Sequence, residues 1–543
     1  MAEQERIPVI DIFAGPGGLG EGFSAFHDKG IHPFKIALSV EKEAAAHQTL
    51  RLRSFFRQFP RGKAPELYYD VLRREVPLSE LPDRLKAKND DLFAKWQAAE
   101  AEAMHAELGI EDTRAEISKR ITKALGSKGR HWVLIGGPPC QAYSIVGRVR
   151  HNKNKAYKIE DDHRSTLYEQ YLHIIADHQP SIFVMENVKG MLSATVENQK
   201  VFQRILSDLQ APPRAVTKNG KPLRYRVVPI VDPPRQRRDG VLLPSDFVVA
   251  CEKYGVPQQR HRVILVGIRE DLGDVELPRL VMSLAPTVRQ TIGALPRLRS
   301  GLSRFREGNK YIPLKDDSQL WLDTIRNWTI RNGDELPWLK GLALDTDCRL
   351  YEQIVATARQ LKVPKAGRGG EYVPLKQAPT TAATLQKWLV DPRLKGVCNH
   401  ESRVHMDSDL ARYLFAACYA QMHKDSPKLN QFPADLQPNH KNATDKDLIF
   451  DDRFRVQLAG SVATTVTSHL SKDGHYFIHY DPAQCRSMTV REVARLQTFP
   501  DNYFFCGPRT SQYVQVGNAV PPWVARQIAE CVWQALVKSG TVG

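Results

Sequence analysis

The sequence predicts an α/β protein built on a doubly wound, mostly parallel sheet, the class in which short apolar strands alternate with helices. A short apolar strand at 8–13 runs into a glycine-rich turn and a helix, and a second strand at 35–40 ends at Glu41. Residues 67–69, ending at Asp70, are expected to form the third strand. The same pattern predicts further strands at 131–135, 181–185 and 262–268.

Changes in composition along the chain indicate more than one domain. Residues 1–274 carry the alternation of strands and helices, interrupted at 71–130 by a predicted helical insertion rich in Ala, Glu and Lys. Residues 275–509 lose the alternation, apart from isolated helices such as 409–422, and are expected to form a second, irregular α+β domain. Residues 510–543 are expected to return to the first domain.

Charge and cysteine content narrow the class of protein. The chain of 543 residues has a formal net charge of +16, which suits a polyanionic partner such as nucleic acid. No apolar run approaches the roughly 18 residues of a membrane span. The N-terminus lacks the layout of a signal peptide, so a cytoplasmic protein is expected. The 8 cysteines show no zinc-binding spacing, which predicts no metal and leaves one free to act as a reagent.

The first motif is the glycine-rich segment 11–20 at the turn from the first strand to a helix. Glycines there permit positive φ angles and let a ligand approach the backbone. The segment also contains G-x-G-x-x-G, and Glu41 follows about 20 residues later, where a carboxylate can accept hydrogen bonds from ribose hydroxyls. The motif therefore predicts a nucleoside cofactor, with an NAD oxidoreductase still open at this point.

A second motif, at 136–141, places Cys140 on a turn stiffened by Pro138 and Pro139, directly after an apolar strand. Ligands bind at the carboxyl ends of strands in open α/β sheets, so this thiol is held where a substrate would lie. Glu186, at the end of the next strand, becomes a candidate acid. A charged run at 258–262 precedes the last strand. An NAD enzyme gives no reason for the Pro-Pro-Cys turn.

Taken in order, these segments resemble the DNA cytosine-5 methyltransferase family of the bacterial restriction–modification type. The resemblance covers roughly 7–70, 131–270 and 486–530, and within 275–485 only 463–466 looks familiar. The matching words are Phe13-Ala14-Gly15-x-Gly17-Gly18, Pro138-Pro139-Cys140-Gln141, Glu186-Asn187-Val188, Gln258-x-Arg260-x-Arg262, Arg486-Ser487-Met488-Thr489-x-Arg491-Glu492 and Gln515-Val516-Gly517-Asn518-Ala519-Val520-Pro521.

The resemblance implies covalent catalysis by Cys140, whose thiolate would attack carbon 6 of a flipped-out cytosine. The attack turns carbon 5 into an enamine-like nucleophile. A protonated Glu186 near ring nitrogen 3 and Arg262 near the exocyclic oxygen would stabilise the charge that develops. Arg260 would support these residues.

The resemblance also implies S-adenosyl-L-methionine as the cofactor and residues 1–274 as the catalytic and cofactor-binding domain. Phe13 could stack on adenine, the Gly15–Gly18 turn could receive the methionine part, and Asp70 stands where the family has an acidic adenine contact. The implied cofactor-binding residues are Phe13, Ala14, Gly15, Gly17, Gly18, Leu19, Glu41, Asp70, Asn518 and Ala519.

Double-stranded DNA is the implied partner, with residues 275–509 as the target-recognition domain. The basic segment 145–165 follows the nucleophile and is expected to close over DNA. Candidate DNA-binding residues are Ser144, Arg148, Arg150, Lys153, Lys155, Arg164, Gln258 and Thr465. A monomer is expected, with a companion restriction endonuclease as a possible partner.

Two alternatives from the same residues remain. One is an RNA cytosine-5 methyltransferase of the same family, against which the long 275–485 region argues. The other is a catalytically inactive DNA-binding protein, against which the intact Cys140, Glu186 and Arg262 argue.

Overall fold

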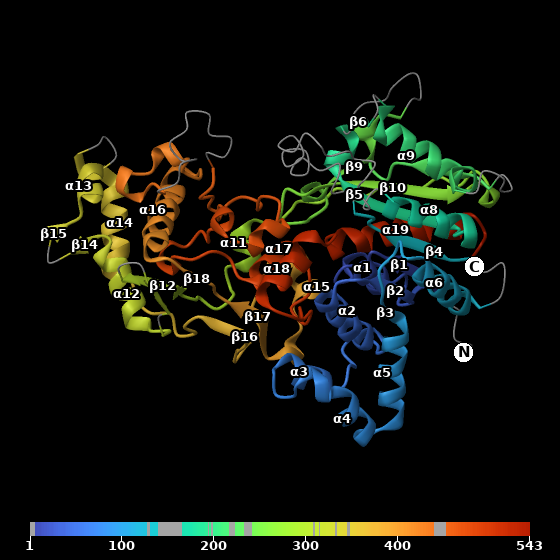
Figure 1. The fold of residues 1–543 in the computed structure, drawn as a ribbon, viewed down its shortest axis with the longest axis horizontal. Coiled ribbons are helices and arrows are strands. Elements are labelled where there is room, and N and C mark those ends of the chain that lie inside the picture. Colours follow the sequence, from blue (N-terminus) through green and yellow to red (C-terminus); the bar gives the residue numbers. More distant parts are fainter. Residues whose placement is uncertain are drawn as a thin grey trace.

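The computed structural model of the chain describes residues 6–126, 131–139, 166–193, 195–196, 199–216, 223–232, 242–307, 310–313, 315–331, 334–344, 348–438 and 452–542. The molecule has two lobes side by side (Figure 1). The first holds the central sheet, and the second holds the helices between α12 and α16. None of the helices in the described ranges is long and apolar enough to cross a membrane.

The first lobe is organised by an 8-stranded sheet of order β3-β2-β1-β4-β5-β10-β8, with β9 paired to β10. The pairs β1–β2, β1–β4, β2–β3 and β4–β5 are parallel, whereas β10 runs antiparallel to β5, β8 and β9. The predicted α/β class is therefore confirmed. The strands are β1 (Ile7–Ile12), β2 (Phe34–Glu41), β3 (Ala103–His105), β4 (Val133–Gly136), β5 (Ile182–Val188), β8 (Tyr225–Val228), β9 (Val248–Ala250) and β10 (His261–Arg269).

Helices cover both faces of this sheet, which is why its central strands are almost continuously apolar. All six residues of β1 and all four of β4 are buried. One apolar cluster joins the sheet to α1 and α19, and a second joins the other face to α6, α8 and α9. These helices are α1 (Gly18–Ala25), α6 (Glu111–Leu125), α8 (Thr166–His178), α9 (Val201–Gln210) and α19 (Pro522–Lys538).

The predicted third strand at 67–69 is wrong, because these residues form helix α3 (Glu66–Leu72). Tyr68, Val71 and Leu72 are buried, and their spacing puts them on one face of a helix. The third strand is β3 instead. It has three residues of weak strand preference, and its parallel pairing with β2 defines it.

The predicted insertion at 71–130 therefore needs correction too, since it contains β3 and α6 of the main fold. The projecting part is α4 (Leu81–Lys88) and α5 (Asp90–Glu102), which hang below the sheet in Figure 1. The first lobe also contains α2 (Ala44–Arg57), α10 (Pro212–Val216) and the short pair β6 (Thr195–Val196) and β7 (Gln199–Lys200).

The second lobe is irregular, as expected, with helices among two-stranded pairings. Helix α16 (Asp407–His423) lies where a helix was predicted at 409–422 and forms the centre of this lobe's apolar core. The other elements are α11 (Val288–Ile292), β11 (Gly301–Leu302), β12 (Arg304–Glu307), β13 (Lys310–Pro313), α12 (Ser318–Asn327), β14 (Ile330–Arg331), β15 (Asp334–Glu335), α13 (Pro337–Leu344), α14 (Cys348–Gln360), β16 (Gly369–Pro374), α15 (Ala383–Leu389), β17 (Gly396–Glu401) and β18 (Val404–His405).

The last part of the chain returns to the first lobe. It runs through α17 (Val490–Leu496) and α18 (Arg509–Asn518) into α19, which packs closely on α1. A Cβ atom built on Gly22 of α1 would lie 2.4 Å from the Cβ of Ala525. Helices α11, α17 and α18 share one apolar core. The domain boundaries at 274 and 509 stay predictions.

Candidate catalytic and cofactor site

Two residues predicted to be catalytic, Glu186 and Arg262, meet at the edge of the sheet where β4 and β5 end and β10 begins. Because β10 is antiparallel to β5, its first residues lie beside the last residues of β5, with Arg262 opposite Val188 and Ile264 opposite Glu186. Gly136 at the end of β4 pairs with Met185 of β5. Motifs from three separate parts of the sequence therefore share one edge.

Glu186 and Arg262 form an ion pair at this edge. The Arg262 Nε lies 2.7 Å from Glu186 Oε1, and each side chain is 12% exposed. The Nε–H makes no aligned hydrogen bond, so the contact is ionic. A Cβ on Gly137 would lie 2.7 Å from Glu186 Oε2, so a larger residue at this position would force the carboxylate to shift.

The turn before Cys140 is held by Asn187. Its Nδ2 donates to the Pro138 carbonyl oxygen at 3.1 Å, and its Oδ1 accepts from the Val188 N–H at 2.8 Å. Residues 140–165 lie outside the described residues, and so do seven predicted site residues: Cys140, Ser144, Arg148, Arg150, Lys153, Lys155 and Arg164.

The glycine-rich turn is joined to the end of β2 through Glu41. Its two carboxylate oxygens accept from the Gly15 N–H at 2.8 Å and from the Glu43 N–H at 2.7 Å. Burial raises the pKa of Glu41, and these N–H donors oppose the shift. The turn contains positive φ angles at Phe13, Gly15 and Gly17. No heavy atom lies within 4 Å of a Cβ built on Gly15, so open space adjoins the backbone there.

The returning chain closes the other side of this turn. A Cβ on Gly18 would lie 2.3 Å from the Val520 oxygen and 3.4 Å from the Ala519 Cβ, so the two segments are in backbone contact. The Tyr503 hydroxyl also donates to the Pro16 oxygen. The predicted meeting of the first and last motifs is therefore seen at Gly18 and Ala519.

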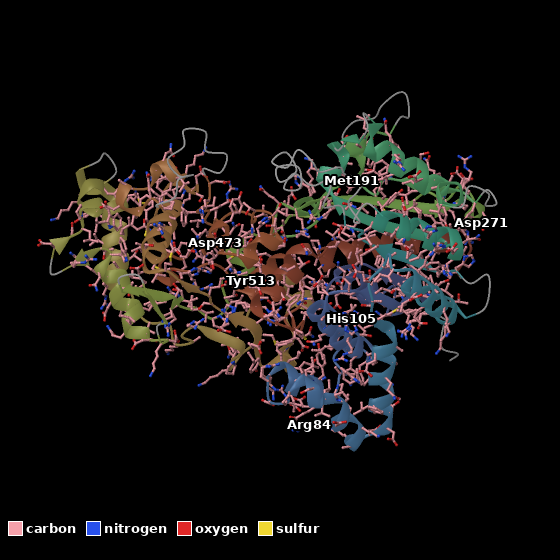
Figure 2. All side chains as sticks on the ribbon, viewed as in Figure 1. Arg84, His105, Met191, Asp271, Asp473 and Tyr513 are labelled. Atoms are coloured by element: carbon pink, nitrogen blue, oxygen red, sulfur yellow. The ribbon has the colours of Figure 1, made fainter. Side chains whose placement is uncertain are left out.

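Asp70 does not take the place predicted for it, because it lies on α3 and not at a strand end. Its carboxylate pairs with Arg73 at 2.6 Å. The acidic residue after the true third strand is Glu107, two residues beyond His105, which ends β3 (Figure 2). The Ala106 N–H donates to the Glu41 oxygen at 3.1 Å, which places this strand end beside Glu41.

Gln258 was predicted to contact DNA, and its burial corrects that prediction: the side chain is 0% exposed. Its Nε2 donates to the Leu496 oxygen at 3.1 Å and to Gln497 Oε1 at 2.8 Å, while its Oε1 accepts from the Val466 N–H at 2.7 Å. A side chain with these partners joins the two lobes and leaves nothing to reach a base.

Arg260, predicted among the catalytic residues, is also 0% exposed. It donates to the oxygens of Val466 at 2.7 Å, Ala519 at 2.8 Å and Gly517 at 3.1 Å. Burial, together with the charge of Arg262, holds the pKa of Arg260 well below its usual value. Arg260 is thus a positioning residue that ties three segments together behind Arg262.

Thr465 lies beside this buried junction and is half-buried. Its hydroxyl donates to the carbonyl oxygen of Gln259, and the preceding Ala463 exchanges backbone hydrogen bonds with Pro257 and Gln259. The weak motif at 463–466 is therefore hydrogen-bonded to residues 257–259, which directly precede the strand that carries Arg262.

Comparison with known proteins decides the family. The model of the C-5 cytosine-specific DNA methylase family matches residues 99–212, 246–329 and 382–534. The chain belongs to this family. The expectation of a DNA cytosine-5 methyltransferase is thus confirmed, and the match begins early enough to include β3.

Similar proteins cover from about three quarters to nearly all of this methylase. The type II methyltransferase M.Bpa9945I of Bacillus paralicheniformis is 31% identical over 96% of this chain and 98% of its own. The DNA (cytosine-5-)-methyltransferase M.ApeKI of Aeropyrum pernix is 26% identical over 74% of this chain and 81% of its own. A solved E. coli prophage protein, titled a "putative DNA modification methyltransferase", covers 98% of this chain and 99% of its own at 17% identity, with a TM-score of 0.47.

Proposed function

We propose that this methylase transfers a methyl group from S-adenosylmethionine to carbon 5 of a cytosine in duplex DNA, through a covalent adduct with Cys140. The observation that carries the proposal is the Glu186–Arg262 ion pair, 2.7 Å long and largely buried, beside the Pro138 turn from which the chain enters Cys140. By analogy with relatives named type II methyltransferases, the modification protects host DNA against a companion restriction endonuclease. The enzyme acts as a monomer.

In the proposed reaction the target cytosine first leaves the base stack and enters the edge between β4, β5 and β10. Its ring nitrogen 3 takes the place of Arg262 as the partner of Glu186, and its exocyclic oxygen accepts from Arg262. Both side chains come from strands, so their positions are set before the base arrives.

The Cys140 thiolate then bonds to carbon 6. Glu186, which takes a proton from solvent as the base displaces Arg262, hydrogen-bonds nitrogen 3, and Arg262 stabilises the charge on the exocyclic oxygen. Bound cofactor supplies an electrophilic methyl group for the carbon 5 nucleophile that results. A water molecule takes the carbon 5 proton, and departure of the Cys140 thiolate then restores the aromatic ring.

The residues around the glycine-rich turn fit a nucleoside cofactor with an amino-acid tail. The Glu41 carboxylate keeps lone pairs for ribose hydroxyls, and the open space at Gly15 admits the methionine part. We therefore retain most of the predicted contacts and replace Asp70 by Glu107 as the acidic adenine contact. The proposed set is Phe13, Ala14, Gly15, Gly17, Gly18, Leu19, Glu41, Glu107, Asn518 and Ala519.

DNA is proposed to lie between the lobes, with residues 275–509 reading the flanking bases. The net charge of +16 supports a polyanion. Thr465, anchored next to Arg260, is placed to hold the phosphate of the flipped nucleotide rather than to read a base. Bisulfite sequencing of DNA from an expressing host would identify the methylated site.

Transfer of tritium from labelled S-adenosylmethionine tests the function. We expect label in duplex DNA and none in RNA, with the Cys140→Ala variant inactive. Duplex DNA containing 5-fluorocytosine should form a stable adduct, because its carbon 5 carries no removable proton, and Cys140→Ser should form none. Labelling of RNA alone would favour the RNA enzyme, and tight DNA binding without transfer would favour an inactive DNA-binding protein.

A further inference from the structure

Helix α3 and the turn before it lie against the second lobe, although they belong to the first part of the chain. Figure 1 shows α3 directly below β16 and β17. The buried face of α3 shares an apolar cluster with the second lobe, in which Tyr68 and Leu72 pack with Leu394 and Cys398. The Cys398 thiol also donates to the Leu72 oxygen at 3.6 Å. The segment 62–73 is called the α3 brace below.

Asp391 is the polar centre of this contact. One oxygen of its carboxylate accepts from the Tyr69 hydroxyl and from Asn502 Nδ2, each at 2.7 Å, and the other accepts from the Arg393 N–H at 3.0 Å. Tyr69 comes from the brace, and Asn502 from the segment that returns to the first lobe. One carboxylate therefore joins three separate parts of the chain.

Arg393 holds the brace from the other side. Its Nη1 donates to the carbonyl oxygens of Gly62 and Ala64, both at 2.8 Å, and its Nη2 donates to Glu66 at 3.2 Å. Its guanidinium also lies 4.4 Å from the centre of the Tyr69 ring. A planar guanidinium with several fixed donors suits such a clasp, which a lysine cannot reproduce.

Side chains join the lobes in at least two regions of the described structure. Gln258 and Arg260 contribute beside the proposed catalytic edge, and the brace contributes at residues 391–398, on a different part of the second lobe. Contacts in separate regions restrict rotation of one lobe against the other more than contacts in one region do. The angle between the lobes sets where a base-reading surface stands relative to a flipped cytosine.

We propose that the α3 brace is a positioning element that sets the orientation of the second lobe on DNA, held by Tyr69 of the brace and by Arg393 of the second lobe. The inference rests on the proposed function in one respect, namely that residues 275–509 hold the DNA. The brace acts on DNA binding and leaves cofactor binding unchanged, because the Gly15–Glu41 contact shares none of its hydrogen bonds.

The test compares Tyr69→Phe, Arg393→Lys and the double variant Tyr69→Phe/Arg393→Met with wild type. Arg84→Met is the matched control, because Arg84 pairs only with Glu80 on the projecting helices and touches no residue of the second lobe in the described contacts (Figure 2). We measure KM for a duplex carrying the methylated site, the Kd for S-adenosylhomocysteine by calorimetry, and the radius of gyration by small-angle X-ray scattering.

We expect the double variant to raise KM for the duplex by about five- to tenfold and to increase the radius of gyration, with the Kd for S-adenosylhomocysteine unchanged. Tyr69→Phe should show a smaller effect of the same kind, because it deletes one hydroxyl and preserves packing. Equal losses in DNA and cofactor binding, or no change in either, would overturn the proposal. If wild type methylates no DNA, the proposed function fails, while the scattering and cofactor measurements still decide the role of the brace.

Discussion

The sheet of the first lobe and the segment 486–503 are both buried, but different forces hold them. The sheet is enclosed between two apolar clusters. The segment 486–503 also contributes to an apolar core, but it buries charges as well: Arg486 meets Glu492 at 2.7 Å and Arg495 meets Asp501 at 2.8 Å, with each of these four side chains at most 2% exposed. Apolar burial is non-directional and indifferent to pH, whereas paired charges depend on each partner. The two regions should therefore fail under different changes.

The largest expected effect comes from comparing the same substitution at Arg260 and at Arg262, two arginines that stand two residues apart. Arg262→Met should lower kcat by about 100- to 1,000-fold in protein that is still folded, because its partner is the proposed reacting carboxylate. Arg260→Met should instead lower the midpoint of urea unfolding, because three backbone oxygens lose their donor. Tritium transfer and urea titration distinguish these outcomes, and an exchange of the two phenotypes would contradict the assigned roles.

Breaking a buried pair should cost more than trimming the sheet. Glu492→Gln leaves Arg486 without its charged partner and should lower the free energy of unfolding by about 3–5 kcal/mol. Ile10→Val in β1 should cost about 0.5–1.5 kcal/mol. Urea unfolding followed by tryptophan fluorescence measures both. Similar losses in the two variants would remove the distinction between the regions.

Buried ionisable groups should also make the two regions respond to pH in opposite directions. His400 and His479 contact Thr489 and Glu492 of the segment, and Asp11 lies in the sheet. Burial lowers the pKa of His400 and of His479 to about 4, so both stay neutral in the fold but bind protons when unfolded. Their contribution is present above the unfolded pKa of about 6.5 and is lost as pH falls towards 4, by roughly 3 kcal/mol for each histidine. Replacing both by glutamine should flatten the acid limb of a plot of stability against pH.

Asp11, in the sheet, should make the protein lose stability as pH rises, which is the opposite direction. Burial raises its pKa to about 8, so the folded state favours the neutral acid and loses stability as pH rises from about 4 through 8. Asp11→Asn should therefore gain stability relative to wild type as pH rises across this range. Thermal unfolding at pH 5 and pH 8 measures the difference, and a gap that shrinks with rising pH would contradict the expected sign.

The smallest effect concerns the surface beside β3. Glu107 makes an exposed ion pair with Lys42 at 3.4 Å, which should contribute at most about 1 kcal/mol to stability. Glu107→Gln should still weaken S-adenosylmethionine binding by a few-fold, about 1 kcal/mol, if it contacts adenine. Asp70→Asn is the control, and equilibrium dialysis gives both affinities. A loss in Asp70→Asn alone would restore the original assignment.

The sequence predicted much of the sheet because its central strands are apolar runs that end in distinctive motifs. A strand that is apolar on both faces is stable only where helices cover both faces of its sheet. The motif ends then share an edge, which is why Glu186 and Arg262 could be placed together without a structure. Strand β3 escaped prediction since it is three residues long and only its pairing with β2 defines it.

The corrected residues show a different limit. Gln258 stands in a run of polar and charged residues that is typical of an exposed surface, yet its partner Gln497 lies 239 positions further along the chain. The brace could not be predicted for the same reason, because Tyr69 and Asp391 are 322 positions apart. Side-chain pairs this distant leave no local periodicity for sequence analysis to detect.

The contact between Gly18 and Val520 also has a consequence for synthesis. The ribosome makes the glycine-rich turn about 500 residues before the backbone that closes it. A nascent chain therefore carries the predicted nucleophile and its proposed acid long before the proposed cofactor site is complete. A chain that ended between these two segments would lack part of that site, so the proposed activity would require α19 to fold onto α1.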